Sequence, residues 1–137
     1  MEIKQNLTSV NYTPNGMKEI RGIVLHSMFG THQGSIAWFK NPESKASAHY
    51  LISQEGEIMQ MVSDKDMAYH AGIFDEPIPD FIRPNPNFYC LGIEFEDRRD
   101  ENWVYPKPQR EAGIWLVDLL MKRYNLKRDR VFLHKNL

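Results

Sequence analysis

The amino-acid sequence predicts an α/β fold with a central mixed β-sheet flanked by helices. Short apolar runs of the kind found in buried strands recur along the chain, and two of them, Gly22–His26 and Val131–His134, end at a histidine. A longer segment before Tyr124 instead has apolar residues at helical spacing. Strands that alternate with helices are typical of a sheet with helices on its faces. At 137 residues, the chain is long enough for one domain and too short for two.

The first half of the chain has the pattern of a short helix followed by a hairpin. The helix is predicted over Ser35–Phe39, with its start at residue 34 or 35 and its stop at Asn41–Pro42. Two strand-like runs follow, Ala46–Ser53 and Glu57–Val62, joined by the turn residues 54–56. We therefore expect these two strands to pair with each other.

The second half begins with a loop and continues with a strand and a helix. Pro77–Pro86 contains four prolines in ten residues, which disfavours both strand ladders and helices. Tyr89–Glu96 has the pattern of a strand, and Pro106 and Pro108 then precede a helix that extends to about Tyr124. The residues at helical spacing in it are Ala112, Trp115, Leu116, Leu119, Leu120 and Arg123.

Composition excludes some classes of partner. The hydrophobic share of 42% and the charged share of 26% are those of an ordinary globular protein. A formal net charge of −1 argues against nucleic acid or an anionic membrane as partner. No apolar run approaches the roughly 20 residues that span a bilayer. Because Met1–Val10 lacks the apolar core of a secretory signal, we expect a cytoplasmic protein.

His26 and His134 are the first candidates for a functional site. Each is expected at the C-terminal end of an apolar strand, where a rigid sheet directs side chains into an open cleft. Neutral imidazole is a good zinc ligand, and a catalytic zinc site uses three protein ligands plus a water. Strand-end histidines are also common as hydrogen-bonded surface residues, so the residues alone leave both interpretations open.

Glu94 is the candidate acid or base. Strand alternation places it on one face with Gly92 and Glu96, while three apolar residues occupy the other face and are expected in the core. The glutamates then face either solvent or a cleft. In a cleft, Glu94 would be positioned to accept a proton from an activated water, with space beside it at Gly92.

The remaining histidines and the cysteine have ordinary structural explanations. His49 and His70 are each consistent with a satisfied core or surface histidine, and His32 is expected to be solvated in a loop. Cys90, the single cysteine, excludes an internal disulfide and is expected to be a buried thiol, with a soft metal ligand as the alternative.

The motifs around these residues gain significance from the order in which they follow one another along the chain. The chain resembles the zinc-dependent N-acetylmuramoyl-L-alanine amidase family, which includes phage lysins, bacterial peptidoglycan-recycling amidases and animal peptidoglycan recognition proteins. The matching stretches run in the family's order across nearly the whole chain and are Ile23–Ser27, Ser47–Ile58, Ala68–Gly72, Leu91–Glu96 and Val131–His134. The family's fold is a central mixed sheet flanked by helices, in agreement with the fold predicted above.

The resemblance implies a set of site residues and a cofactor. His26 and His134 match the first two ligands of a Zn²⁺ ion, and Glu94 matches the catalytic glutamate of the recycling-type branch. His70 and His49, with the neighbouring Tyr69, are implied to lie at the substrate cleft. Ala48 stands where the phage-type branch has a tyrosine, which places the chain closer to the recycling type.

The resemblance departs from the family after His134. The family's third zinc ligand, an aspartate or cysteine, lies beyond the second histidine, whereas this sequence ends at Leu137. We therefore expect residues 1–137 to be a single amidase domain that lacks its C-terminal segment, and expect it to bind zinc weakly.

The function implied is zinc-dependent hydrolysis of the amide between N-acetylmuramic acid and the L-alanine of a peptidoglycan stem peptide. Peptidoglycan or a muropeptide is then the partner, with release to the cell wall if the protein is a phage lysin. The alternative is a non-catalytic module that binds peptidoglycan or muropeptides, as in recognition proteins with an incomplete ligand set.

Overall fold

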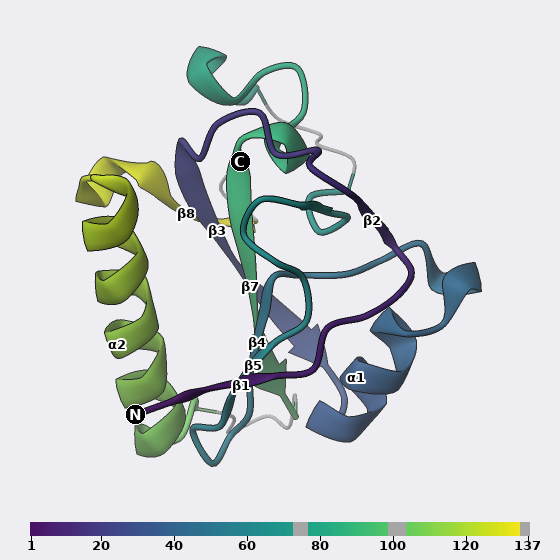
Figure 1. The fold of residues 1–137 in the computed structure, drawn as a ribbon. Coiled ribbons are helices and arrows are strands. Elements are labelled where there is room, and N and C mark those ends of the chain that lie inside the picture. The colour runs from purple at the N-terminus through teal and green to yellow at the C-terminus, as the bar shows by residue number, and fades with distance from the viewer. Residues whose placement is uncertain (73–76, 99–103, 135–137) are drawn as a thin grey trace.

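A computed structural model of the chain describes residues 1–72, 77–98 and 104–134. Its centre is a six-stranded mixed sheet with the strand order β1-β5-β4-β7-β3-β8 (Figure 1). The strands of this sheet are β1 (Ile3–Gln5), β3 (Gly22–Phe29), β4 (Tyr50–Ile52), β5 (Ile58–Gln60), β7 (Cys90–Asp97) and β8 (Val131–Leu133). A second, two-stranded sheet pairs β2 (Tyr12–Thr13) with β6 (Met67–Ala68). The predicted α/β fold with a mixed sheet is confirmed.

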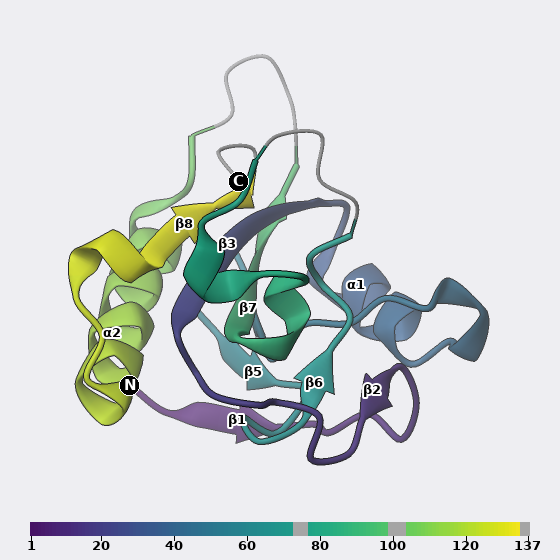
Figure 2. The same ribbon diagram turned by 90° about the horizontal axis from the view of Figure 1, so that it is seen from above.

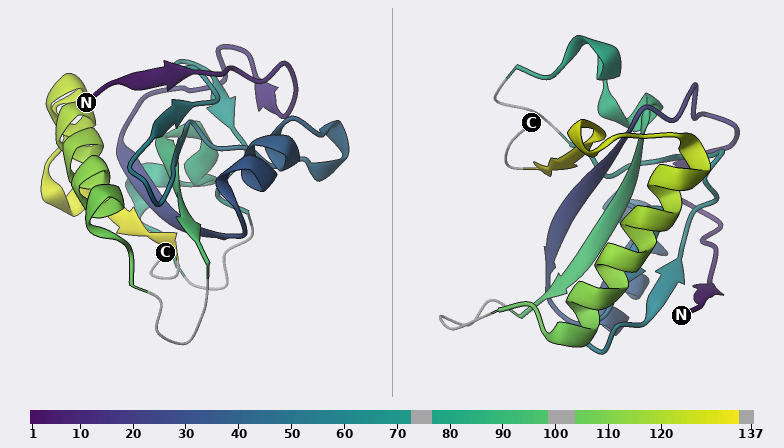
Figure 3. Two further views of the ribbon diagram at one scale, coloured as in Figure 1. Left: turned by 90° about the horizontal axis from the view of Figure 1, so that it is seen from below. Right: turned by 90° about the vertical axis from the view of Figure 1, so that its left-hand side faces the viewer.

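Two α-helices lie on opposite sides of the large sheet (Figure 2). The helix α2 (Lys107–Tyr124) runs along one face, as the right-hand view of Figure 3 shows. The shorter α1 (His32–Phe39) covers part of the other face. Four 3₁₀ turns complete the described elements, at Pro42–Ser44, Asp80–Ile82, Pro86–Phe88 and Arg128–Arg130. None of the helices within the described ranges is both long enough and apolar enough to cross a membrane.

Burial on the α2 face follows from strand alternation. The apolar residues of β3 and β7 that point to this side pack against the buried stripe of α2. The fully buried members of this core are Ile23, Tyr50, Ile52, Ile58, Leu91, Ile93, Ala112, Leu116 and Leu120. α2 ends at Asn125, whose left-handed backbone (φ 54°) stops the helix.

Two separate apolar clusters cover the opposite face. Near the C-terminal ends of β3 and β7, residues of α1 pack with β4 and β5 around Phe39 and Leu51. Near the N-terminal ends, the proline-rich segment contributes Ile78 and Ile82, which pack on Val24. The histidines and Glu94 lie between these two clusters.

Several boundaries differ from those predicted. α1 begins at His32 rather than at residue 34 or 35, because Thr31 is the N-cap and its hydroxyl accepts a hydrogen bond from Gly34 N at 3.0 Å. His32 is consequently buried in the helix, and the expectation that it is solvated was wrong. The hairpin β4–β5 is confirmed as an antiparallel pair, with strands shorter than expected.

Glu94 and Glu96 do not face solvent, which was one of the two expectations for this face of β7. Both point away from α2, as alternation predicts, but Glu96 is only 1% exposed. Its carboxylate accepts hydrogen bonds from Gln54 N and Arg98 Nε, which satisfy the buried oxygens. This face of β7 is therefore covered rather than solvated.

The apolar core between α2 and the sheet should make the largest contribution to the free energy of unfolding. Leu120→Ala removes a fully buried side chain from the core and should lower the free energy of unfolding by about 2–5 kcal/mol. Ile114 lies on the same helix and is 72% exposed, so Ile114→Ala is the matched control and should change the free energy of unfolding by less than about 0.5 kcal/mol. Urea denaturation measures both, and equal losses would contradict this assignment of the core.

Candidate functional site

Parallel strand register brings three of the predicted site residues together. β3 pairs in parallel with β7, and His26 lies directly opposite Glu94. β8 pairs with the other edge of β3, with Leu133 opposite Leu25, so the next residue, His134, comes beside His26. The two imidazole centroids are 4.6 Å apart, and His26 Nδ1 lies 3.9 Å from Glu94 Oε1.

Burial keeps His26 and Glu94 in uncharged forms. His26 is 6% exposed and Glu94 is 9% exposed. Burial, with a smaller contribution from the neighbouring His134, lowers the pKa of His26 to about 3. Burial likewise raises the pKa of the Glu94 carboxyl to about 8. At neutral pH, His26 is therefore the neutral imidazole that metal ions require.

His70 lies beneath His26, with both ring nitrogens engaged by the protein. Its Nε2 is 3.0 Å from the carbonyl oxygen of Cys90, and its Nδ1 is 3.0 Å from His26 Nε2. The ring crosses β7 at Gly92, where a Cβ atom would stand 2.4 Å from His70 Cγ. Glycine is required there because any side chain would displace the imidazole. The contact of His70 with substrate stays a prediction.

His49 and Tyr69 are held by other parts of the fold. His49 is fully buried, accepts a hydrogen bond from Gly92 N at 3.0 Å and donates from Nε2 to the carbonyl oxygen of Asp66 at 2.8 Å. The Tyr69 hydroxyl shares a 2.8 Å hydrogen bond with Thr13 Oγ1, which ties it to the two-stranded sheet. Their predicted roles at the substrate cleft likewise stay predictions.

The hydrogen-bond partners determine the tautomers of the two candidate ligands. A carbonyl oxygen only accepts, so His70 carries its proton on Nε2 and its Nδ1 must accept the proton of His26 Nε2. The lone pair of neutral His26 is then on Nδ1. His134 donates from Nε2 to the carbonyl oxygen of Ala71 at 2.9 Å, so its neutral form also carries the lone pair on Nδ1.

This donor set fits part of a zinc site. Two adjacent imidazoles, each with its Nε2 atom hydrogen-bonded to the protein, have the arrangement that metal-binding histidines commonly show. A catalytic zinc site normally takes three protein ligands. Within residues 1–72, 77–98 and 104–134, no three His, Cys, Asp or Glu side chains are grouped to hold a metal ion. The described residues thus supply two candidate ligands.

Cys90 does not extend this set. Its thiol is buried in the apolar cluster beneath the proline-rich segment, and burial raises its pKa to about 12. The expectation of a buried thiol is confirmed.

Asn87 is a site residue that sequence reasoning missed. It lies in the 3₁₀ turn Pro86–Phe88 and is 8% exposed. Its Oδ1 accepts hydrogen bonds from the backbone N–H groups of His70 and Ala71, at 3.3 and 3.0 Å. An asparagine between a proline and a phenylalanine gives no local signal for this long-range contact.

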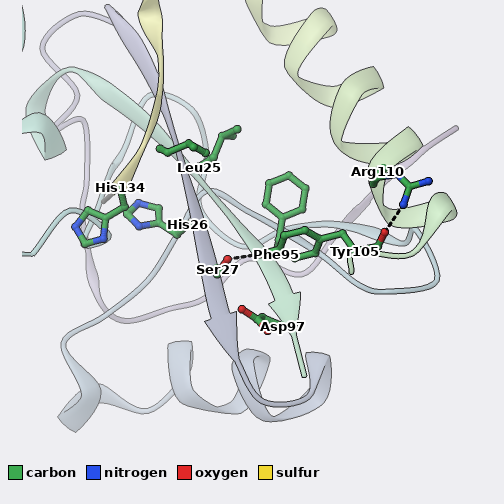
Figure 4. A pocket seen from close by; sticks show the side chains of 9 residues that line it. Leu25, His26, Ser27, Phe95, Asp97, Tyr105, Arg110 and His134 are labelled. Carbon is green, nitrogen blue, oxygen red and sulfur yellow. Dashed lines mark hydrogen bonds between the residues drawn. The ribbon is translucent and has the colours of Figure 1, made fainter. Parts of the chain in front are cut away.

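A pocket of about 550 Å³ begins at the two imidazoles (Figure 4). Its lining includes Leu25 and His26, consecutive residues of β3 whose side chains point to opposite faces of the sheet. His26 and His134 form one end, and Phe95, Tyr105 and Arg110 lie toward the other. Leu25, Ser27, Asp97 and Leu133 complete the lining. The volume is in the range of small-ligand sites.

Comparison with known proteins identifies relatives of this chain. A sequence profile described as N-acetylmuramoyl-L-alanine amidase matches residues 16–137. N-acetylmuramoyl-L-alanine amidase A of Achromobacter lyticus is 36% identical over 99 residues, which are 70% of this chain and 49% of that protein. The 1,6-anhydro-N-acetylmuramyl-L-alanine amidase AmpD of Haemophilus influenzae is 30% identical over 93 residues, 67% of this chain and 47% of that protein. The chain thus spans about half the length of these relatives.

Solved structures show the same fold. A selenomethionine AmpD derivative has a TM-score of 0.79 at 23% identity, over 98% of this chain and 82% of that chain. A mutant endolysin from Bacillus subtilis has a TM-score of 0.73 at 22% identity, over 98% and 84% of the two chains.

The raised pKa of Glu94 predicts a pH dependence of stability in metal-free protein. The folded value of about 8 exceeds the ordinary 4.5, so the folded state binds the additional proton between these values. Stability should therefore fall as pH rises through this window, by up to ~1.4 kcal/mol per pH unit from this group. Below about pH 4.5 the titration of Glu94 does not change the free energy of unfolding, and above about pH 8 its full destabilising effect is present.

Glu94→Gln lacks this titration and serves as the reference. Urea unfolding of both proteins in chelator, at about pH 5 and about pH 8, should give a stability difference that shifts in favour of the variant at the higher pH. A difference independent of pH would show that burial does not perturb Glu94.

Proposed function

We propose that this chain, which belongs to the N-acetylmuramoyl-L-alanine amidase family, hydrolyses the amide bond between N-acetylmuramic acid and L-alanine in peptidoglycan, with Zn²⁺ held by His26 and His134. The observation that carries the proposal is the convergence of these two imidazoles beside Glu94. The names of the relatives support the substrate, and the pocket that begins at His26 supports the position at which it binds.

Each of the three side chains has a defined task in this proposal. His26 and His134 present the Nδ1 lone pairs as ligands, with their Nε2 protons already engaged. Bound zinc supplies Lewis acidity, which polarises a carbonyl group and acidifies water. Glu94 accepts a proton from the attacking water as the new C–O bond forms, and returns it to the amine nitrogen as the C–N bond breaks.

The environment of Glu94 suits proton transfer in both directions. A carboxyl group with an ordinary pKa is a weak base at neutral pH, and efficient proton transfer favours a pKa near the operating pH. Burial raises the pKa of Glu94 to about 8, and a cation bound beside it would favour the carboxylate that accepts the proton. Its distance of 3.9 Å from His26 Nδ1 leaves it close to an ion bound at that nitrogen.

A second candidate function is binding of muropeptides without turnover. The observation that favours it is the presence of two, rather than three, metal-ligating side chains among the described residues. The two functions differ in product: hydrolysis of a muropeptide releases a free L-alanine amino group, whereas binding alone releases none.

The test is turnover of a soluble muropeptide by the zinc-supplemented protein and by Glu94→Gln. Loss of the general base should reduce turnover by about 10²–10⁴, while the fold and zinc affinity are retained. New amino termini, followed by amine labelling, measure the reaction. Binding without any new amino terminus would favour the second candidate, and full activity of Glu94→Gln would remove Glu94 from the mechanism.

A further inference from the structure

Two consecutive residues, His70 and Ala71, accept hydrogen bonds from the two candidate metal ligands. The ring of His70 accepts the Nε2 proton of His26, and the backbone carbonyl of Ala71 accepts the Nε2 proton of His134. The distances are 3.0 and 2.9 Å. One dipeptide thus determines which nitrogen of each imidazole keeps its lone pair.

This dipeptide is itself fixed at three points. Asn87 Oδ1 accepts the N–H groups of both His70 and Ala71, and the His70 ring donates to the carbonyl oxygen of Cys90 in β7. Asn87 N–H in turn donates to Asn85 Oδ1 at 2.9 Å, which holds the 3₁₀ turn. His70, Ala71 and Asn87 are all at most 8% exposed, so water competes little for these hydrogen bonds.

We propose that the His70–Ala71 dipeptide, anchored by Asn87, is the element that positions the two metal-binding imidazoles, and that His70 and Asn87 are positioning residues of the site. This rests on the proposed function in one respect, that His26 and His134 bind zinc. Neither His70 nor Asn87 is required to touch zinc or substrate.

The physical basis is the cost of orienting a ligand. A free imidazole interconverts between two tautomers and rotates about its side-chain bonds, so binding a metal through one nitrogen selects among several states. A partner that holds the opposite N–H removes this cost before the metal arrives. Loss of such partners typically lowers metal affinity by 10–100-fold.

The first test uses two variants that divide the contacts of His70. In His70→Asn, the side-chain oxygen stands near the former Nδ1 and still accepts from His26, whereas the contact with Cys90 is lost. In His70→Gln, the amide reaches the former Nε2 and still donates to Cys90, whereas the acceptor for His26 is lost. We expect His70→Gln to bind Zn²⁺ about 10–100-fold more weakly than the wild type, and His70→Asn to lose less.

A second readout needs neither zinc nor substrate. In the metal-free wild type, the ¹⁵N chemical shifts of His26 should report the tautomer protonated on Nε2. His70→Gln should show a mixture of tautomers, and His70→Asn should keep the wild-type pattern. A merely structural role for His70 would leave the His26 tautomer unchanged in both.

The second test addresses Asn87. Asn87→Ala removes the acceptor of both N–H groups, whereas Asn87→Asp keeps an oxygen at that position. Asn87→Ala should weaken zinc binding and disturb the tautomers of His26 and His134 together, and Asn87→Asp should do so less.

Equal zinc affinity within each pair, with unchanged His26 shifts, would overturn the proposal. The outcome is separable from the proposed function: absence of turnover in the wild type would contradict the amidase, yet the tautomer difference within each pair would still support the positioning role.

Discussion

The parallel register of three strands is the constraint on which the site depends. Neighbouring residues of parallel strands point to the same face of a sheet, so the pairing of His26 with Glu94 and of Leu25 with Leu133 fixes which side chains meet. A shift of one residue in either pair would turn Glu94 or His134 toward the α2 core. The large apolar core on that face opposes such a shift, because it would bury polar side chains without hydrogen-bond partners against leucine and isoleucine. Packing on one side of the sheet thereby maintains the site on the other.

Burial shifts the pKa of Glu94 and the pKa of His26 in opposite directions. Both His26 and Glu94 are held in neutral forms, the imidazole with its pKa near 3 and the carboxyl with its pKa near 8. A neutral imidazole is ready to bind a cation, and a cation bound beside Glu94 would in turn favour the carboxylate. The metal-free site is therefore destabilised at high pH, a cost that the core on the α2 face must offset. The hydrogen bonds that His26 and His134 donate to His70 and Ala71 fix which imidazole nitrogen carries the proton, since burial alone does not choose between the two nitrogens.

The sequence predicted the parts of the fold that have strong local patterns. The apolar strands that became β3, β7 and β8, the β4–β5 hairpin and α2 were all identifiable, and so were His26, His134 and Glu94 as residues at strand positions. β1, β2 and β6 were not predicted. Each is held by a partner strand that is distant in sequence, as in the parallel pairing of Ile3 with Ile58. The interlocking of the His70 ring with Gly92, and the contacts of Asn87, depend on segments that the chain brings together only after folding. Local propensity contains no information on such contacts.

Zinc ligation by Nδ1 of His26 and His134 is tested most directly by a crystal structure of the protein soaked with Zn²⁺. Anomalous scattering is measured on both sides of the zinc absorption edge. We expect one anomalous peak within about 2.0–2.1 Å of Nδ1 of both His26 and His134, with their Nε2 atoms still hydrogen-bonded to His70 and to the carbonyl oxygen of Ala71. Zinc bound through Nε2 of either residue, or bound elsewhere with these two imidazoles unaltered, would contradict it.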